Sequence, residues 1–359
     1  MTWLTSRFDI SFTFFAARCN VLTAAGFYLR YLLDGMSSLG IDLDDLASSQ
    51  GVALAGLTDP GCRVSLDAID AVLQGANQAY EAKGAGGQQG VPLSLQLGGA
   101  VTPTALDVLA YASMSSGTLG DAIDLLCQFE PYRLGFAECE VSEEGDQAVV
   151  TLHAQGPWPT LPMQVEIALA GWIEFGRWIT GNASHPVCIE LAHTAHASLA
   201  HHEAFFHCPV LAGRARYAVH IDRRLLSQRL AASNPDVCRL MREEMQRRIE
   251  RHARGEQFLT RLERAIEACL SDGAPTMERV AQGMALEPRQ LRAQARAAGT
   301  TLLAEVDAVR QRLARQHLAG GVPLADISQR LGYSEQSAFN RACVRWFGVS
   351  PGKWRADLS

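Results

Sequence analysis

The C-terminal part of the chain contains one pattern twice, and this repeat restricts the fold more than any other feature of the sequence. In each copy a short segment carries apolar residues one helical turn apart, a tight turn follows, and a second segment carries polar and basic residues; the copies span 276–299 and 323–348. This is the plan of a helix-turn-helix unit, whose second helix enters the major groove of DNA while the first braces it. A helical bundle that contacts only protein is the alternative. Two copies in register favour an all-α module that binds DNA.

The second copy supplies each part of such a unit. Its small core is predicted from four apolar side chains, Leu324, Ile327, Leu331 and Phe339. Gly332 is placed to form the turn, and Ser334 to cap the helix that follows. That helix presents candidates for DNA contact along one side: Gln336, Ser337, Asn340, Arg341 and, one turn further, Arg345. Glutamine, asparagine and arginine can pair bidentately with base edges, and serine can reach a phosphate.

These two copies, with the ending GVSPGKWR at 348–355, closely resemble the AraC/XylS family of bacterial transcriptional regulators. The ending matches the family's G-x-x-P-x-x-x-R pattern, and LGYSEQSAFNRACVRWFGVSP matches its second motif nearly throughout. The resemblance implies two helix-turn-helix units joined by a central helix, TTLLAEVDAVRQRLARQHLAG. Together they would read two major-groove segments roughly 34 Å, or one helical turn, apart.

The first copy departs from the family pattern. Ala285 stands where the family has a turn glycine, Glu287 where it has a Ser or Thr cap, and Ala295 where it has a bulkier core residue. In the second copy Cys343 replaces a phenylalanine. We therefore expect the second unit to be the better formed. The candidates for DNA contact in the first are Arg289, Gln290, Arg292 and Arg296. Whether its arginines read bases or only contact phosphate is left open.

The larger N-terminal part mixes helical and strand patterns and is predicted to be an α+β effector domain over 22–232. Helical spacing runs from Leu22 to Tyr80, and the alternation in VPLSLQLG predicts a short strand. Two helices, a hairpin around SEEGD, a helix after Pro162 and two last strands follow. The segment resembles the effector domain of the AraC/XylS branch that includes regulators of ornithine use and of virulence. That resemblance implies sensing of a small molecule and leaves the effector unidentified.

These patterns divide the chain into four parts. They are an N-terminal extension at 1–21, the effector domain at 22–232, a connecting helix at 233–256 and the DNA-binding domain at 257–359. The connecting helix is amphipathic and is predicted to end near Gly255. Pairing of this helix with a second copy is one reason to expect a homodimer.

Charge is distributed unevenly along the chain, whose formal net charge is −6. Residues 1–256 contain 18 Lys and Arg against 28 Asp and Glu, whereas residues 257–359 contain 14 against 10. A basic C-terminal module suits a polyanion such as double-stranded promoter DNA. Activation is the commoner mode of the family, so RNA polymerase is a further expected partner.

The stretch HTAHASLAHHEAFFHC, residues 193–208, also suggests chemistry, because it holds five of the ten histidines and a cysteine. His193-x-x-His196 is a spacing that a metal could use. The stretch lacks the helical His-Glu-x-x-His motif and a set of thiolates. We therefore predict no metal and no cofactor, and we expect most of these histidines to face water. The alternative is a metal-responsive sensor or a metal-dependent enzyme that uses His193–Cys208.

Two tryptophans, Trp172 and Trp178, lie near Glu174 and Arg177 on the helix after Pro162. We expect them in the core, with the wall of an effector pocket as the alternative.

The sequence shows no Ser-His-Asp set, phosphate loop or carboxylate pair, so no enzymatic activity is expected. The apolar run ISFTFFAA is too short to span a membrane and lacks the flanks of a signal peptide. A cytoplasmic protein without a membrane partner is therefore expected.

Overall fold

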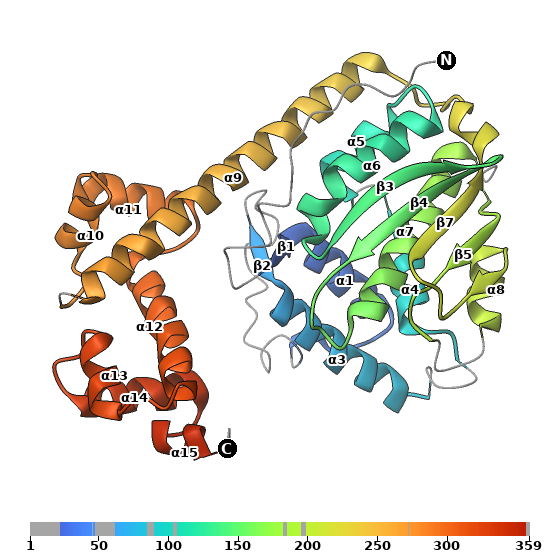
Figure 1. Ribbon diagram of the computed structural model, residues 1–359. Helices are drawn as coiled ribbons and strands as arrows, with labels where there is room; N and C mark the ends of the chain where they lie inside the picture. Colours follow the sequence, from blue (N-terminus) through green and yellow to red (C-terminus); the bar gives the residue numbers. More distant parts are fainter. Residues whose placement is uncertain are drawn as a thin grey trace. The chain divides into compact units, whose positions relative to one another are not determined.

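Two units make up the part of the chain that the computed structural model describes, which is residues 22–44, 46, 62–84, 90–102, 106–181, 185–194, 199–271 and 273–356 (Figure 1). The first unit extends to Ile249 and the second begins at Glu250. The predicted extension at 1–21 lies outside the described residues, as do most of the glycine-rich loop after Lys83 and His196.

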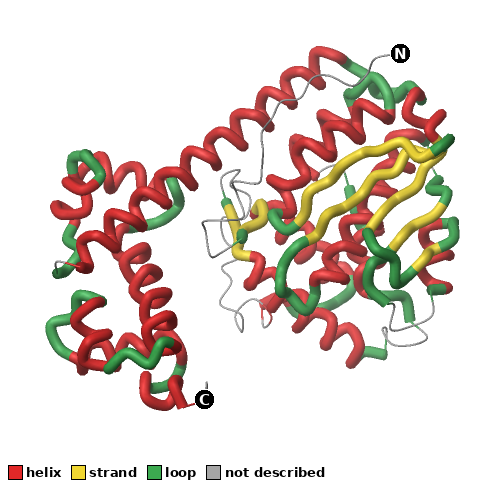
Figure 2. Tube along the Cα trace, viewed as in Figure 1, coloured by secondary structure: helices red, strands yellow, loops and turns green. Residues whose placement is uncertain are grey.

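A five-stranded sheet in the order β3-β4-β7-β5-β6 forms one layer of the first unit (Figure 2). Its strands are β3 (Ala137–Glu144), β4 (Gln147–Ala154), β5 (Cys188–Glu190), β6 (Val210–Leu211) and β7 (Tyr217–Asp222). All neighbours pair antiparallel except β5 and β6. The hairpin predicted around SEEGD is confirmed, since Glu144 pairs with Gln147 across a two-residue turn in which Gly145 has φ +66°. A separate antiparallel pair joins β1 (Thr23–Ala25) and β2 (Arg63–Ser65).

Helices pack against the sheet and complete the predicted α+β architecture. They are α1 (Gly26–Ser38), α3 (Leu66–Ala82), α4 (Leu93–Gly99), α5 (Asp107–Met114), α6 (Leu119–Leu134), α7 (Leu161–Thr180), α8 (Ala200–Phe206) and the 3₁₀ helix η3 (Arg223–Ser227). The predicted Ser65 cap of α3 is confirmed, because its side chain accepts a hydrogen bond from the Ala68 N–H at 3.1 Å. One core joins α1, α3, α4 and α7 to the sheet.

The strand predicted for VPLSLQLG is wrong, because this segment forms α4. The helix is buried on most sides, so its leucines show no helical periodicity and their alternation misleads. It packs closely on α7 at Gly98, where an added Cβ would lie 2.4 Å from the Cβ of Ala170. The glycine therefore marks a close helix crossing rather than the end of a strand.

The second unit is entirely helical over its described residues, as predicted. Its elements are the end of α9 (Pro235–Ser271), then α10 (Met277–Gly283), α11 (Pro288–Ala297), α12 (Leu302–Ala319), α13 (Leu324–Arg330), α14 (Gln336–Phe347) and α15 (Pro351–Ala356). The prediction that the connecting helix ends near Gly255 is wrong, since α9 continues to Ser271. One glycine costs a helix only about 1 kcal/mol. Phe258, Leu262 and Ile266, which follow it, are buried in the core of the second unit.

Within the described part of the chain, no helix combines the length and the apolar character that crossing a bilayer would require.

Candidate nucleic-acid interface and effector site

The helix pair α13–α14 forms the second predicted helix-turn-helix unit. Ile327, Leu331 and Phe339 are fully buried in its core as predicted, while Leu324 packs at the edge. Gly332 forms the turn with φ +69°, a left-handed conformation that favours glycine. Cys343 is also fully buried, and burial raises the pKa of its thiol to about 11.

The Ser334 cap predicted for α14 is wrong. The N-cap position falls on Glu335, one residue later, whose backbone is extended and whose side chain makes no capping hydrogen bond. Ser334 is therefore one residue too early to reach the free N–H groups of the first turn.

The candidate contact residues of α14 share one side of the helix. Gln336, Ser337 and Arg341 are exposed, and Asn340 is half-buried between them. The amide oxygen of Asn340 is buried without a hydrogen-bond partner. The amide must turn for this oxygen to gain a partner, because a buried polar atom without a partner is costly.

Arg345, the last candidate on α14, is held by the protein itself. Its Nη2 atom lies 2.6 Å from Oδ1 of Asp307 on α12. The indole N–H of the neighbouring Trp346 donates to the other carboxylate oxygen of Asp307 at 2.9 Å. Both partners in the ion pair are partly exposed, so the pair is worth little to stability and leaves the arginine able to rearrange.

The helix pair α10–α11 forms the first helix-turn-helix unit. Arg289, Arg292 and Arg296 are exposed on α11 at helical spacing, and no ion pair holds any of them within the described residues. Gln290 is also exposed, but its side-chain oxygen accepts a hydrogen bond from the Glu287 N–H at 3.0 Å. Capping therefore occupies the oxygen of Gln290, while the three arginines project from the helix.

The departures predicted for the first unit have structural consequences. Ala285 adopts φ +55°, a left-handed conformation that costs a residue with a Cβ about 1 kcal/mol. Ala295 is buried beside Leu291 in a core to which α9 and α12 also contribute. The first helix-turn-helix unit thus forms around a core that it shares with α9 and α12, and the backbone of its turn is strained.

The helix α12 connects the two helix-turn-helix units and packs into the core of each. Val306 and Val309 are buried in the core of the first helix-turn-helix unit, whereas Ala314 and Leu318 are buried in the core of the second. Packing of a single helix into both cores fixes the distance between α11 and α14.

The N-terminal unit, residues up to 249, is called the effector unit. In it, the expectation that the histidines of 193–208 face water is wrong for two of them. Nε2 of His193 and Nε2 of His202 lie 2.9 Å and 3.2 Å from the same oxygen of Glu166 on α7. The Ser94 hydroxyl donates to the other oxygen of this buried carboxylate. A buried carboxylate requires such partners. Although burial itself raises its pKa, the hydrogen bonds from the two imidazoles and Ser94 lower the pKa of Glu166 to about 2.

The other described residues of this stretch do not converge on one point. His207 is exposed and ends α8 in a left-handed conformation. Burial raises the pKa of Cys208 to about 12, which disfavours the thiolate that metals prefer. Over the residues that the structure describes, no group of three or more His, Cys, Asp or Glu side chains is placed to hold a metal.

A small closed cavity lies among α1, α6 and α7 of the effector unit. Its lining includes Tyr28, Tyr31, Leu106, Arg133, Ile167 and Trp172, and its volume of about 10 Å³ is room for one water. The Tyr28 hydroxyl is buried without a hydrogen-bond partner. Arg133 forms a buried ion pair with Glu130, and the Trp172 indole N–H donates to Glu130 at 2.7 Å. Sequence reasoning missed this polar cluster, because α1 and α6 are distant in the chain.

The two tryptophans of α7 have different environments. Trp172 is half-buried at the cavity, whereas Trp178 is 55% exposed, so the expectation of a core position is wrong for Trp178. Arg177 pairs with Glu174 and donates to the carbonyl oxygens of Phe205 and Phe206 at 3.0 Å and 2.7 Å. These contacts give Arg177 a structural role at the end of α8.

Comparisons with known proteins agree with this architecture. The family described as "Arabinose-binding domain of AraC transcription regulator, N-term" matches residues 40–230, and a "Helix-turn-helix domain" family matches residues 280–357. The "Ornithine utilization regulator" of Pseudomonas aeruginosa is 26% identical over 332 residues, which cover 91% of this chain and 95% of that protein. The "HTH-type transcriptional regulator VirS" of Mycobacterium tuberculosis is 27% identical over 54% of this chain and 57% of its own length.

Among solved structures, the transcriptional regulator CdpR from Pseudomonas aeruginosa aligns with 92% of this chain and 98% of its own, at 20% identity and a TM-score of 0.41. The matched families and curated relatives are those of transcriptional regulators and not of enzymes. A family match over more than half of the sequence, together with two helix-turn-helix units behind an α+β effector domain, shows that the chain belongs to the AraC family of DNA-binding transcriptional regulators.

Proposed function

We propose that this regulator activates transcription by reading promoter DNA through α14 and α11, under control of a small molecule bound by the effector unit. The observation that carries DNA reading is the side of α14 on which Gln336, Asn340 and Arg341 lie together. When this amide turns into the groove of DNA, the amino group of an adenine would supply the donor that the Asn340 oxygen lacks. Arg341 is exposed and can pair with a guanine in the same groove.

The arginines of α11 support a different kind of contact. Arg289, Arg292 and Arg296 give this helix a row of positive charge, and the oxygen of Gln290 is occupied by capping. A helix that presents arginines but no free amide oxygen is better suited to binding phosphates than to discriminating bases. We assign base reading mainly to α14 and positioning on the backbone mainly to α11, with Ser337 and Arg345 as further contacts.

The test is a gel-retardation assay with duplexes that the purified protein selects from genomic fragments. We expect Arg341→Ala to lose selective binding while weak binding to unrelated duplex remains, because each good bidentate base contact is worth about 1–3 kcal/mol. Arg251→Ala, an exposed arginine on α9, is the matched control and should bind like wild type. Wild-type selectivity in Arg341→Ala, together with wild-type affinity in Arg289→Ala, would show that the recognition helices are misassigned.

Effector binding is assigned to the region around the cavity among α1, α6 and α7, which has room for one water as it stands and must widen to admit an amino acid. Its support is the unpartnered Tyr28 hydroxyl beside the buried Arg133–Glu130 pair, since such groups are costly in a core that serves only packing. One relative is named for ornithine utilization, so amino acids are the first compounds to screen, followed by fatty acids and sphingoid bases. A true effector raises the melting temperature of the wild type and raises that of Tyr28→Phe less. An equal rise in both proteins would place the effector elsewhere.

Dimerisation through α9 and contact with RNA polymerase complete the proposal for a cytoplasmic activator. Val237 and Leu240 are exposed apolar side chains one turn apart near the start of α9. If this surface pairs with a second copy, sedimentation should show a dimer for the wild type and a monomer for Leu240→Glu. A dimer that persists in this variant would exclude this surface.

A further inference from the structure

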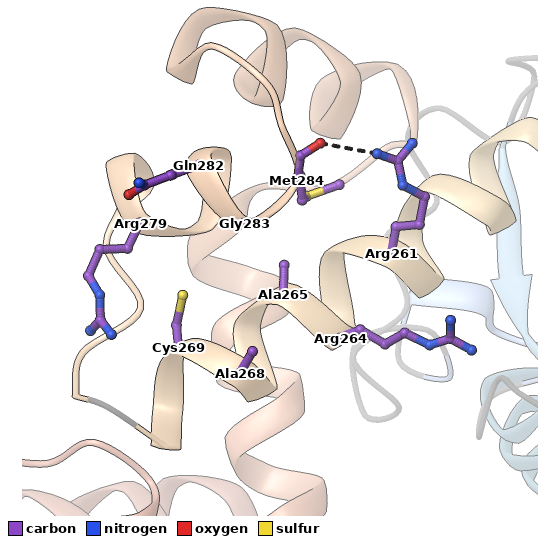
Figure 3. A pocket seen from close by; sticks show the side chains of 9 residues that line it. All are labelled: Arg261, Arg264, Ala265, Ala268, Cys269, Arg279, Gln282, Gly283 and Met284. Atoms are coloured by element: carbon purple, nitrogen blue, oxygen red, sulfur yellow. Dashed lines mark hydrogen bonds between the residues drawn. The ribbon is translucent and has the colours of Figure 1, made fainter.

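An open groove of about 490 Å³ lies between α9 and α10 in the C-terminal unit of the chain, beside the first helix-turn-helix unit (Figure 3). Its floor is formed by small or apolar side chains, Ala265, Ala268, Cys269 and Met284. Arg279 lies toward one end, and Arg261 and Arg264 lie toward the other. No residue of α11 or α14 lines it, so the groove is separate from the surfaces assigned to DNA reading.

The charge of this groove is unbalanced among the described residues that line it, since three of them are arginines and none is acidic. Glu263 and Glu267 lie on another side of α9, where both pair with Arg312 of α12. By contrast, none of the three groove arginines forms an ion pair with any described residue. Glu263 and Glu267 are thus paired with α12, whereas Arg261 and Arg264 of the same helix line the groove.

Two of these arginines are partly engaged by backbone oxygens. Arg261 donates to the Met284 carbonyl at 3.1 Å, and Arg279 donates to the Ala274 carbonyl at 2.8 Å. A carbonyl oxygen satisfies one donor and leaves the positive charge without a counter-charge. These bonds hold the two guanidinium groups at opposite ends of the groove, and Arg264 is exposed at the same end as Arg261.

We propose that this groove is the docking site for an acidic amphipathic helix of a protein partner. The apolar floor between cationic ends complements a helix that presents small apolar residues along one stripe and glutamates or aspartates on either side of it. A DNA backbone would match the arginines but would leave the apolar floor without a complementary surface. This role goes beyond DNA reading and effector binding, because it gives the DNA-binding unit a protein-facing surface of its own.

The test uses the full-length protein and a fluorescent helix-forming peptide of about 18 residues. The peptide carries alanine and leucine on one stripe and glutamate on its flanks, and the control peptide has lysine at every glutamate position. Anisotropy is measured at roughly 0.15 M salt, where interactions between distant exposed charges are screened. We expect the wild type to bind the glutamate peptide at least tenfold more tightly than the lysine peptide.

Charge reversal then locates the binding. Arg264→Glu should weaken binding of the glutamate peptide at least tenfold, and Ala268→Glu, which fills the exposed floor, should do the same. Arg251→Glu, on α9 outside the groove, should bind like wild type. Equal binding of both peptides by the wild type, or wild-type binding by Arg264→Glu and Ala268→Glu, overturns the proposal.

A second readout separates a protein partner from DNA. The affinity for an unrelated duplex is measured against salt concentration for the wild type and for Arg264→Gln. A lost phosphate contact lowers the magnitude of the log–log slope by about 0.9. We expect an unchanged slope, and a decrease of that size would assign the groove to the phosphate backbone instead.

Discussion

Glu166 is a buried carboxylate whose charge depends on three hydrogen-bonding side chains. In the folded protein its pKa is lowered to about 2 by His193, His202 and Ser94, against the opposing effect of burial. In the unfolded chain a glutamate takes up its proton near pH 4.3. The carboxylate therefore contributes stability that is complete above about pH 5 and is lost as the pH falls toward 2.

This predicts a measurable loss of stability in acid. Between pH 5 and pH 2 the contribution of Glu166 to the free energy of unfolding should fall by about 3 kcal/mol. Urea unfolding at several pH values measures it, with Glu166→Gln as the comparison. The variant should be less stable than the wild type at pH 6, and the difference should shrink in acid. A difference that does not change with pH would contradict this role of the carboxylate.

Ala285 supports a second prediction at this scale. Its left-handed backbone, with φ +55°, is strained for alanine and unstrained for glycine. Ala285→Gly should raise the free energy of unfolding by about 0.5–1 kcal/mol, after allowance for the greater freedom of glycine in the unfolded chain. The matched control is Ala293→Gly on the exposed side of α11, which should lower stability by about 1 kcal/mol. A loss of stability in both variants would show that the turn is not strained.

The sequence predicts some single residues where the chemistry is local, although the cap predicted at Ser334 is wrong. Ser65 was identifiable as a cap because its partner is three residues away, and Gly332 because a turn requires its conformation. The environment of His193 and His202 was not identifiable, since Glu166 comes from another helix and no spacing within 193–208 indicates it.

At the scale of elements, α9 shows how little one glycine influences a helix anchored at both ends. Gly255 lies in its interior, and an added Cβ there would meet nothing within 4 Å. Gly255→Ala should therefore raise stability by about 1 kcal/mol in chemical unfolding. Gly98→Ala is the opposite case, since its Cβ would clash with Ala170, and it should be strongly destabilising. Destabilisation by Gly255→Ala would mean that a helical conformation is not preferred there.

The same contrast explains which elements the sequence predicts. Amphipathic helices such as α3, α12 and α14 follow from periodicity, because one face of each is exposed. The pattern of α4 predicts a strand instead, because burial removes the polar face that would show helical periodicity. The two-residue strand β6 is too short to carry an alternation, and only pairing with β5 defines it.

At the scale of the whole molecule, DNA binding should require both helix-turn-helix units at a fixed spacing, because α12 is packed into both of their cores. Insertion of about 5 bp between the two contacted segments turns one of them to the opposite face of the duplex. We expect this duplex to lose selective binding in a gel-retardation assay. Unchanged affinity would show that one unit is sufficient for recognition.

The sensitivity of binding to salt tests the basic C-terminal module, residues 257–359. If α11 positions the protein on phosphates, Arg292→Gln should weaken binding to selected and unrelated duplexes alike. It should also lower the magnitude of the salt slope by about 0.9. A change in sequence preference without a change in slope would instead make Arg292 a reader of bases.

The helix shared by both cores, α12, also limits how such a protein can evolve. A codon gained or lost within it would rotate the residues beyond that point by about 100° and misalign one core. Side chains on the exposed sides of α11 and α14 carry no such constraint and can change one at a time. Descendants of this chain can therefore acquire new target sequences readily, whereas the interval between the two halves of each target is inherited almost unchanged.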